Sequence, residues 1–553
     1  MAMSPTLSVQ LRKHRQFVFH YVVVACLLAL STWAAYLLFE QPELAIDDAR
    51  IFFVYGENIS SGNGIVYNTG GERVEGFTSP LWLIFVTLGI AIFNSPDVWL
   101  LLFSMLTLSG AIAALWYFEV SRKLISWQSA LFVVWLIGVP SYVVWMSLPL
   151  MDVTIWSSII IISAIITIRG NSPRGLAISI VFLVLARPEG VLWGLVFMSL
   201  FAMNVASKYG ISKVWSKLRL PFAAYFLTVT VLFGARMAYF GYLMPNTYYA
   251  KVSPDLSYSL GQGSIFLLAF VAANLPAMMI VLWSSISGIL FNLPRFIREV
   301  KTFPIVFDTK LNVRYLIVST IAITGLLIPV LSGGDHFRLF RFYQPIWPLF
   351  LLPILELFMS IQLKTSKAIK YGLLFSFLVL IVFSTAPRWD TLANDFFTIE
   401  FIVAEEGSNL GKQLNRMFEH DPPIVGVPAA GGVALEYDGP VVDIYGLNNV
   451  AMAHSAGSRY GLKNHSAFNS DVFLKQQPDL FWPVVGTREA LLSSLPDYEH
   501  STSLNSIYSD HRFIRLYALV LITDSDAGIR AFVRRDYLDI LINRGFDVME
   551  IDY

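Results

Sequence analysis

Long, uninterrupted runs of apolar residues recur along this 553-residue chain and constrain its fold more than any other feature. The first run, Phe17 to Phe39, is long enough to cross the roughly 30 Å hydrocarbon core of a bilayer as a helix. It is too long for the core of a secretory signal, and no small-residue cleavage pattern ends it, so we interpret it as a retained transmembrane helix. Because 56% of the residues are hydrophobic and only 14% are charged, we expect lipid to surround most of the chain.

About ten further runs meet the same length criterion, which predicts a polytopic α-helical membrane protein with about eleven transmembrane helices. In chain order they are Val98 to Val120, Trp127 to Trp145, Val153 to Ile168, Gly175 to Ala186, Val191 to Ala206, Pro221 to Phe240, Ile265 to Leu290, Val313 to Leu331, Tyr343 to Ile361 and Tyr371 to Ala386.

A shorter apolar run, Pro80 to Phe93, has about the length of an interfacial or buried helix. Counting it as a span would place Arg122 and Lys123 outside and invert every later loop, whereas excluding it places the basic loops on the cytoplasmic side, as the positive-inside rule requires. We therefore predict that this run is a juxtamembrane helix at the outer surface, with Ser79 as its N-cap and Pro80 at its first position.

The positions of the charges also predict the orientation of the chain. Arg12, Lys13 and Arg15 precede the first span, so the N-terminus is expected in the cytoplasm and the first outer loop over residues 40–97. An odd number of spans then delivers the C-terminal part to the outer side. We expect a membrane domain over 1–387 and a soluble, exocytoplasmic α/β domain over 388–553.

The predicted C-terminal domain is richer in Gly, Pro, Asp, Asn and Ser than the rest of the chain. Strand-like segments occur at Pro423 to Val427, Val441 to Tyr445 and Phe513 to Ile522. The stretch GVPAAGG (426–432) lacks the glycine spacing and the lysine of a phosphate-binding loop, so we interpret it as a turn between strands.

Composition excludes several classes of function. The chain has 39 basic residues (Lys plus Arg) and 39 acidic residues (Asp plus Glu). It therefore lacks the excess of basic residues that is typical of a nucleic-acid-binding protein. The single cysteine, Cys26, excludes an intramolecular disulfide and a cysteine-based metal cluster.

The predicted outer loops carry most of the unusual polar residues. Asp47 and Asp48 follow the first span directly, and they are candidates both for helix capping and for acid–base catalysis. Successive residues do not share a helix face, so only one of the two is expected to point into a given cavity.

Basic residues in other outer loops could hold a phosphate. Arg338 and Arg341 in GGDHFRLFRF (333–342) share a face if that segment is helical, although two arginines that extend to the membrane surface give the same pattern. Arg187 in ARPEG (186–190) could equally be paired with Glu189, and Lys251 could simply be an interfacial lysine.

Several segments taken together resemble one bacterial family. They are IDDARIFFVYGENISSGNGIVYNTGGERVEGFTSPLW (46–82), ARPEG, MPNTYYAK (244–251), GGDHFRLFRF and VVDIYGLNN (441–449). In this order they resemble the polyprenyl-phosphate-dependent GT-C glycosyltransferases, most closely the terminal arabinofuranosyltransferases of the mycobacterial cell wall and their relatives in other bacteria.

The resemblance implies an enzyme of the bacterial cytoplasmic (inner) membrane that takes a sugar from a polyprenyl phosphate at the outer face. The acceptor would be a hydroxyl group of a cell-envelope glycan or of a surface protein such as pilin. An outer-loop aspartate is the catalytic base in such enzymes, which here would be Asp47, with Asp48 as the next candidate. The family pattern is not followed at SLPLMD (147–152), so no role is carried over to Asp152.

The remaining predicted site residues divide by role. Donor phosphate binding is expected from Arg187, His336, Arg338, Arg341 and Lys251. Substrate binding is expected from Glu75, Tyr248, Tyr249 and Asp335.

Some alternatives stay open at this level. The sugar could be D-arabinofuranose, mannose or aminoarabinose, and no protein metal site or cofactor is predicted, although a divalent metal could bridge an aspartate to the phosphate. A transporter or flippase for a lipid-linked sugar would also have many spans. The near absence of ionisable residues from the middles of the predicted spans favours chemistry at the membrane surface.

Overall fold

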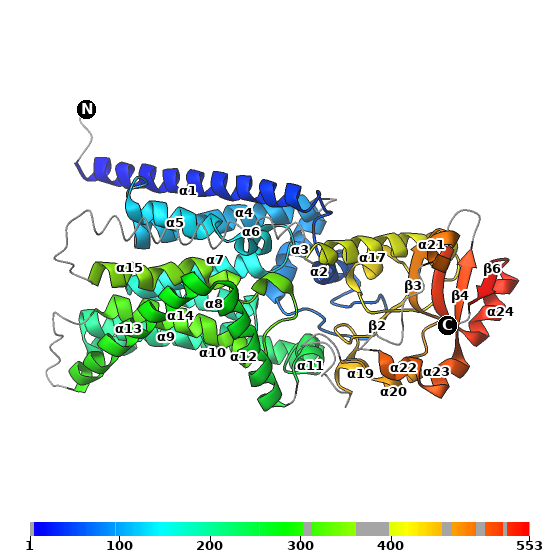
Figure 1. Ribbon diagram of the computed structural model, residues 1–553. Coiled ribbons are helices and arrows are strands. Elements are labelled where there is room, and N and C mark those ends of the chain that lie inside the picture. Colours follow the sequence, from blue (N-terminus) through cyan, green and yellow to red (C-terminus); the bar gives the residue numbers. More distant parts are fainter. Residues whose placement is uncertain are drawn as a thin grey trace.

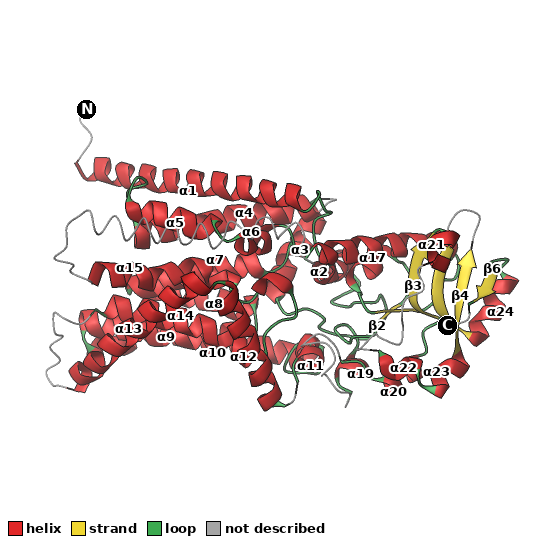
Figure 2. Ribbon diagram, in the orientation of Figure 1, coloured by secondary structure: helices red, strands yellow, loops and turns green. Residues whose placement is uncertain are grey.

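The computed structural model describes residues 5–93, 96–253, 255–301, 312–360, 397–455, 467–493, 504–523 and 528–551. They form a long helical bundle and a C-terminal domain that packs against one end of it (Figure 1). We call this the domain-side end. The first helix, α1, begins at the opposite end of the bundle, and the strands of the C-terminal domain lie far from that end (Figure 2).

Most of the described residues before 361 are helical. The bundle contains α1 (Pro5–Leu38), α3 (Pro80–Ile92), α4 (Pro96–Leu115), η1 (Trp116–Val120), α5 (Trp127–Ile137), α6 (Pro140–Ser147), α7 (Val153–Arg169), α8 (Pro173–Ala186), α9 (Gly190–Tyr209), η2 (Ile211–Lys213), α10 (Val214–Tyr239), α12 (Leu256–Ala273), α13 (Leu275–Lys301), α14 (Val313–Leu331), η4 (Gln344–Phe350) and α15 (Leu351–Ser360). Three short helices lie at its domain-side end: α2 (Asp47–Ser60), α11 (Asn246–Lys251) and η3 (Arg338–Phe340).

The chain is a polytopic helical protein. Within the described residues, seven helices are long and apolar enough to cross a membrane, or eight if the pair α5 and α6, bent by 66°, is a single span. The predicted spans at Val153 to Ile168, Gly175 to Ala186 and Tyr343 to Ile361 correspond to shorter apolar helices. The last predicted span, Tyr371 to Ala386, and the predicted domain boundary at 387/388 lie outside the described residues.

The predicted span Ile265 to Leu290 is two helices rather than one. The chain breaks at Asn274, whose side chain donates a hydrogen bond to the Phe270 carbonyl at 2.9 Å. Gly263 of α12 lies against Val330 of α14, and Gly288 of α13 lies against Tyr315 and Ser319 of the same helix. The earlier glycine thus contacts the end of α14 and the later glycine contacts its beginning. Helices α12 and α13 therefore follow one another antiparallel to α14, with a break between them at Asn274.

The run Pro80 to Phe93, predicted to form a helix at the membrane surface, contains the 13-residue helix α3. Ser79 caps it by accepting a hydrogen bond from the Trp82 amide at 3.1 Å, and Pro80 occupies the first turn. Ile84, Leu88 and Ile92 are spaced four residues apart and are all exposed, so one face of α3 presents an apolar stripe. Such a stripe suits a helix that lies along the membrane surface.

The C-terminal domain is a mixed six-stranded sheet with helices. The strand order is β2-β1-β3-β5-β4-β6, with β1 parallel to β2 and β3 and the other pairs antiparallel. The strands are β1 (Val425–Val427), β2 (Val441–Asp443), β3 (Leu480–Gly486), β4 (Tyr517–Thr523), β5 (Gly528–Arg534) and β6 (Asp547–Glu550). The helices are α17 (Thr398–Met417), α18 (Gly431–Glu436), α19 (Val450–Ala453), α20 (Ser470–Gln476), α21 (Arg488–Ser493), α22 (Asn505–Tyr508), α23 (His511–Leu516) and α24 (Arg535–Asn543).

All three predicted strand segments contain a strand, but the third does so only in its second half. Phe513 to Ile522 begins within helix α23 and becomes strand only at Tyr517. Asp510 explains the difference because its side chain caps α23, accepting a hydrogen bond from the Arg512 amide at 2.8 Å. The GVPAAGG stretch was also misread, since it leads from β1 into helix α18 rather than between strands.

The loop between α1 and α3 fastens the two parts of the molecule together. The Asn68 side chain donates to the Val441 carbonyl at 2.9 Å and accepts from the Val441 amide at 3.0 Å, so it pairs with the backbone of edge strand β2. Tyr67 donates to the Ala430 carbonyl at 2.6 Å. Arg50 of α2 donates to the Ala404 carbonyl of α17 at 3.0 Å.

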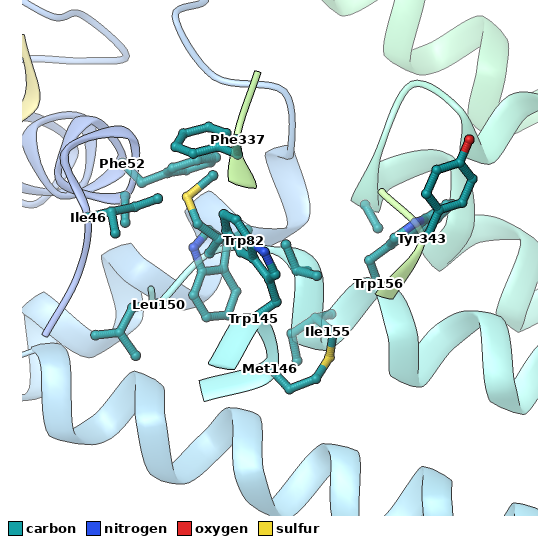
Figure 3. Packing of buried hydrophobic residues seen from close by; sticks show 14 of the residues in the cluster. Ile46, Phe52, Trp82, Trp145, Met146, Leu150, Ile155, Trp156, Phe337 and Tyr343 are labelled. Atoms are coloured by element: carbon teal, nitrogen blue, oxygen red, sulfur yellow. The ribbon is translucent and has the colours of Figure 1, made fainter. Parts of the chain in front are cut away.

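Large apolar side chains fill the space beneath this junction. Trp82 of α3, Trp145 of α6 and Phe337 are buried in one cluster with residues of α2 and α7 (Figure 3). Deeper in the bundle the indoles of Trp135 and Trp347 stack at 4.6 Å, and each ring nitrogen donates to the carbonyl of the other residue, at 2.8 and 2.9 Å. The two polar N–H groups are thereby satisfied within the apolar interior.

The predicted orientation can be tested by labelling from one side. Ser61 at the domain-side end and Ser212 in η2 are both exposed, and serine differs from cysteine by one atom. In a Cys26→Ser background we expect Ser61→Cys, and not Ser212→Cys, to react with a membrane-impermeant maleimide applied to the outside of intact cells. Labelling of Ser212→Cys alone would reverse the orientation.

Candidate functional site

A cavity of about 420 Å³ opens at the domain-side end of the bundle. Its walls come from α2, the loop before α3, the α8–α9 loop, α11, the start of α12, the end of α14 and the segment 332–342, and Leu447 contributes from the C-terminal domain. Most of the lining is apolar. Six acidic or basic residues also line it: Asp48, Arg187, Glu189, Lys251, Asp335 and Arg341.

Asp48 lies between two cations in this cavity. Its carboxylate is 3.3 Å from the Lys251 ammonium and 3.9 Å from an Arg341 guanidinium nitrogen. Lys251 ends the short helix α11, which also places Thr247 and Tyr248 on the cavity wall. The structure therefore brings together Asp48, Lys251 and Arg341, which the sequence places in three separate loops.

Arg341 is held mainly by Asp335. Its Nε donates to Asp335 Oδ2 at 2.7 Å and its Nη2 to Oδ1 at 3.0 Å, a two-pronged contact. The guanidinium group also lies 4.3 Å from the ring centre of Phe337 and 5.2 Å from that of Phe342. These contacts fix the plane of the guanidinium group and leave Nη1 facing Asp48.

Arg187 is paired with two carboxylates. It donates to both oxygens of Asp152, at 3.1 and 2.9 Å, and to both oxygens of Glu189, each at 3.2 Å. Burial lowers the pKa of Arg187, but the two carboxylates outweigh it and raise that pKa overall. Burial likewise raises the pKa of Glu189, but the charge of Arg187 lowers it overall. Burial raises the pKa of Asp152, although the charge of Arg187 opposes the shift. Asp152 thus has a structural role as a partner of Arg187, which the family pattern could not assign.

Two predicted phosphate ligands lie elsewhere. Arg338 is exposed and His336 half-buried, and neither is among the described residues that line the cavity. The helical face proposed for Arg338 and Arg341 does not form, because Leu339 and Phe340 have positive φ angles of 61° and 55°. The imidazole of His336 packs on Phe337 at 4.0 Å.

The predicted substrate-binding residues also divide. Tyr248 and Asp335 line the cavity. Glu75 does not: it is buried against Arg236 of α10, which donates to it at 2.9 to 3.0 Å. Tyr249 is not among the described residues that line the cavity, and its ring packs against His454 of the C-terminal domain, with 4.2 Å between the ring centres.

Asp47 points away from the cavity, into the C-terminal domain. Its Oδ1 accepts from the Gly432 amide at 2.7 Å and its Oδ2 from the Gly431 amide at 3.0 Å. Burial raises the pKa of Asp47 to about 6, although the two amides lower it. Both carboxylate oxygens are thus engaged at the start of α18, which leaves Asp48 as the aspartate of the pair that faces the cavity.

A carboxylate that the sequence gave no reason to select lies near Asp48. Glu400 is in the first turn of α17, half-buried, one turn before the Ala404 carbonyl that Arg50 contacts. The pKa of Glu400 is raised to about 7, chiefly by burial and then by the charge of Asp48, while the charge of Arg341 opposes the shift. Because Glu400 and Asp48 are far apart in the sequence, local sequence patterns could not predict that they interact.

The cavity's chemistry follows from these groups. It offers one carboxylate between two cations, a third cation paired nearby, and a large apolar wall. Such a set can bind an anionic group attached to an apolar chain and accept a proton from a neutral hydroxyl. Within the described residues, no group of three or more His, Cys, Asp or Glu is placed to hold a metal ion.

A scan against known protein-family models and a search of curated proteins found no match to this chain. The resemblance drawn from the sequence therefore stays a prediction.

Glu400 gives a pH test of the site's electrostatics. Its pKa is raised on folding, from 4.5 to about 7, so its contribution to stability is complete below pH 4.5 and is lost as the pH rises through 7. Glu400→Gln cannot ionise, so the variant should not lose this stability as the pH rises. We therefore expect the difference in Tm, variant minus wild type, to increase from pH 5 to pH 8. Glu406→Gln, an exposed position of the same helix, is the control and should leave the pH dependence of Tm unchanged.

Proposed function

We propose that this protein is a membrane glycosyltransferase that moves a sugar from a polyprenyl phosphate to a hydroxyl acceptor. The observation that carries the proposal is the position of Asp48, between Lys251 and Arg341 in a cavity with apolar walls. Following the sequence resemblance, the fold is proposed to be of the GT-C type. The enzyme would work at the outer face of a bacterial inner membrane.

The cations suit the donor. A polyprenyl phosphate sugar carries a phosphodiester charge next to a long apolar chain, and the cavity combines Lys251 and Arg341 with a wall that includes Leu192, Leu256 and Leu331. These three leucines are strongly exposed, so this wall continues onto the apolar outer surface of the bundle. The donor phosphate would compete with Asp48 for Lys251 and Arg341 and so release the carboxylate for catalysis.

Asp48 is proposed as the general base, in place of Asp47. The acceptor hydroxyl transfers its proton to the Asp48 carboxylate while the acceptor oxygen forms a bond to the anomeric carbon. The bond between that carbon and the phosphate oxygen breaks, and polyprenyl phosphate leaves with the electron pair. Lys251 and Arg341 stabilise the charge that grows on the leaving phosphate. Arg187, already balanced by two carboxylates, would mainly orient the donor.

The sugar and the acceptor follow from the resemblance alone. D-Arabinofuranose is proposed as the sugar, with mannose or aminoarabinose as alternatives, and a cell-envelope glycan or a surface protein such as pilin as the acceptor. Release of free polyprenyl phosphate is the signature of transfer. A flippase would move the intact donor across the membrane and release none.

The role of Asp48 is tested by one nearly isosteric change. Asp48→Asn cannot accept the proton, so sugar transfer from a synthetic polyprenyl-phosphate donor should fall by roughly a hundredfold to ten-thousandfold. Asp48 is not a cap of α2, but the change removes a charge partner of Lys251 and Arg341, so Tm is measured alongside to separate lost transfer from lost folding. Transfer at the wild-type rate in this variant would remove Asp48 from the mechanism.

The role of Arg341 is tested against its neighbour. We expect Arg341→Ala to weaken donor binding by about 1.5 to 3 kcal/mol, the range for a hydrogen bond to a charged group. Arg338→Ala, three residues away and outside the cavity lining, is the matched control and should bind donor nearly as the wild type does. Because Arg341→Ala leaves Asp335 without its guanidinium partner, Tm is measured alongside, and Arg341→Lys should restore binding only in part. Equal donor affinity in Arg338→Ala and Arg341→Ala would contradict the assignment.

A further inference from the structure

The two aspartates at the start of α2 serve different parts of the molecule. Asp48 faces the cavity, whereas Asp47 accepts hydrogen bonds from the Gly431 and Gly432 amides of the C-terminal domain. They are consecutive residues in one helical turn, so a force on one backbone position moves the other. The attachment of Asp47 therefore bears directly on where the Asp48 carboxylate lies.

Two glycines of α18 allow close backbone approaches, Gly431 to Asp47 of α2 and Gly432 to α17. A β-carbon at Gly431 would lie 1.9 Å from the Asp47 carbonyl oxygen, and one at Gly432 would lie 2.5 Å from the Ala404 carbonyl oxygen. Neither overlap can be relieved by a side-chain rotation, because both involve backbone atoms. The backbone of α18 thus packs directly on the backbone of α2 at this point.

The rest of the α2 N-terminus is held by the bundle. The Ala45 amide donates to the Leu148 carbonyl at 3.2 Å and the Ile46 amide to the Pro149 carbonyl at 3.3 Å. Ile46, at the N-cap position, supplies no side-chain cap to the helix. The first turn is therefore held from the bundle through residues 45 and 46 and from the C-terminal domain through Asp47.

We propose that the contact of Asp47 with Gly431 and Gly432 holds Asp48 at its place in the cavity, so that the C-terminal domain is a working part of the active site. Asp47 is then a positioning residue, and Asp48 is the group that meets the substrate. This inference rests on the proposed transferase function.

Asn68 provides a matched comparison within the same loop. Like Asp47, its side chain makes two hydrogen bonds to the backbone of the C-terminal domain, here to the Val441 amide and carbonyl. Unlike Asp47, it is remote from Asp48 in sequence, and it is not among the described residues that line the cavity. A variant at Asn68 loosens the same interface and leaves the first turn of α2 attached.

The experiment compares Asp47→Ala with Asn68→Ala in the full-length protein. We measure sugar transfer from a synthetic polyprenyl-phosphate donor, and we measure hydrogen exchange of residues 45 to 52 by mass spectrometry. In Asp47→Ala we expect kcat to fall about tenfold to a hundredfold, as expected for losing charge-assisted hydrogen bonds, with the KM for donor within about twofold. Exchange in the first turn of α2 should become faster. Asn68→Ala should retain kcat and the exchange pattern of α2.

Glycine substitutions test the same contact from the other side. Gly431→Ala should also lower kcat, because its β-carbon would meet the Asp47 carbonyl oxygen and push α18 away from the first turn of α2. Gly234→Ala in α10, where an added β-carbon meets no atom within 4 Å, is the control for replacing glycine and should be active. Should Asp47→Ala not fold, the nearly isosteric Asp47→Asn replaces it, since it keeps one acceptor and loses the other.

The outcomes separate this inference from the proposed function. Equal kcat and equal exchange in Asp47→Ala and Asn68→Ala would overturn the positioning role while the wild type still transfers sugar. The positioning role would also be overturned if Asp47→Asn lost as much kcat as Asp48→Asn while Gly431→Ala kept full activity. That result would identify Asp47 as the general base. If the wild type transfers no sugar, the proposed function fails, and the exchange measurement alone decides whether Asp47 holds the turn.

Discussion

The buried guanidinium groups of Arg187 and Arg341 govern the layout of the cavity. Taking a charge out of water costs several kcal/mol unless a partner and hydrogen bonds compensate it. Here the compensation comes from Asp152 and Glu189 for Arg187 and from Asp335 for Arg341. These partners come from the loops before α7 and α9 and from the segment after α14, so the same ion pairs tie the ends of several helices together.

A second cluster of charges lies at the opposite end of the bundle. Arg314 of α14 contacts Glu119 of η1 at 2.6 Å and also pairs with Glu356 of α15, while Arg169 of α7 approaches Glu119 at 3.9 Å. The two clusters show that paired charges at helix ends are a structural device in this molecule.

Hydropathy predicted the helices well because the length and apolarity of a span are local properties. The cap at Ser79 and the length of α3 were readable for the same reason. The break at Asn274 was missed, since the run stays apolar through it.

In the candidate site, Lys251 and Arg341 were predicted from residue type and loop position. The resemblance favoured Asp47 over Asp48 as the base, but the sequence could not show that Asp47 binds the amides of Gly431 and Gly432 in α18, nearly four hundred residues later. Glu400 was missed for the same physical reason, and Arg338 was included because two positive φ angles cannot be read from spacing.

The pairing of Asn68 with Val441 has a further consequence for handling the C-terminal domain. Strand β2 is the edge of the sheet, and an edge strand exposes unpaired amide and carbonyl groups that can recruit another chain. In the whole protein the α1–α3 loop covers part of this edge. A fragment that begins at α17 would lack that cover and would also expose the Gly431 and Gly432 amides. Such a fragment is therefore at risk of self-association through β2, and the domain is better studied attached to the bundle.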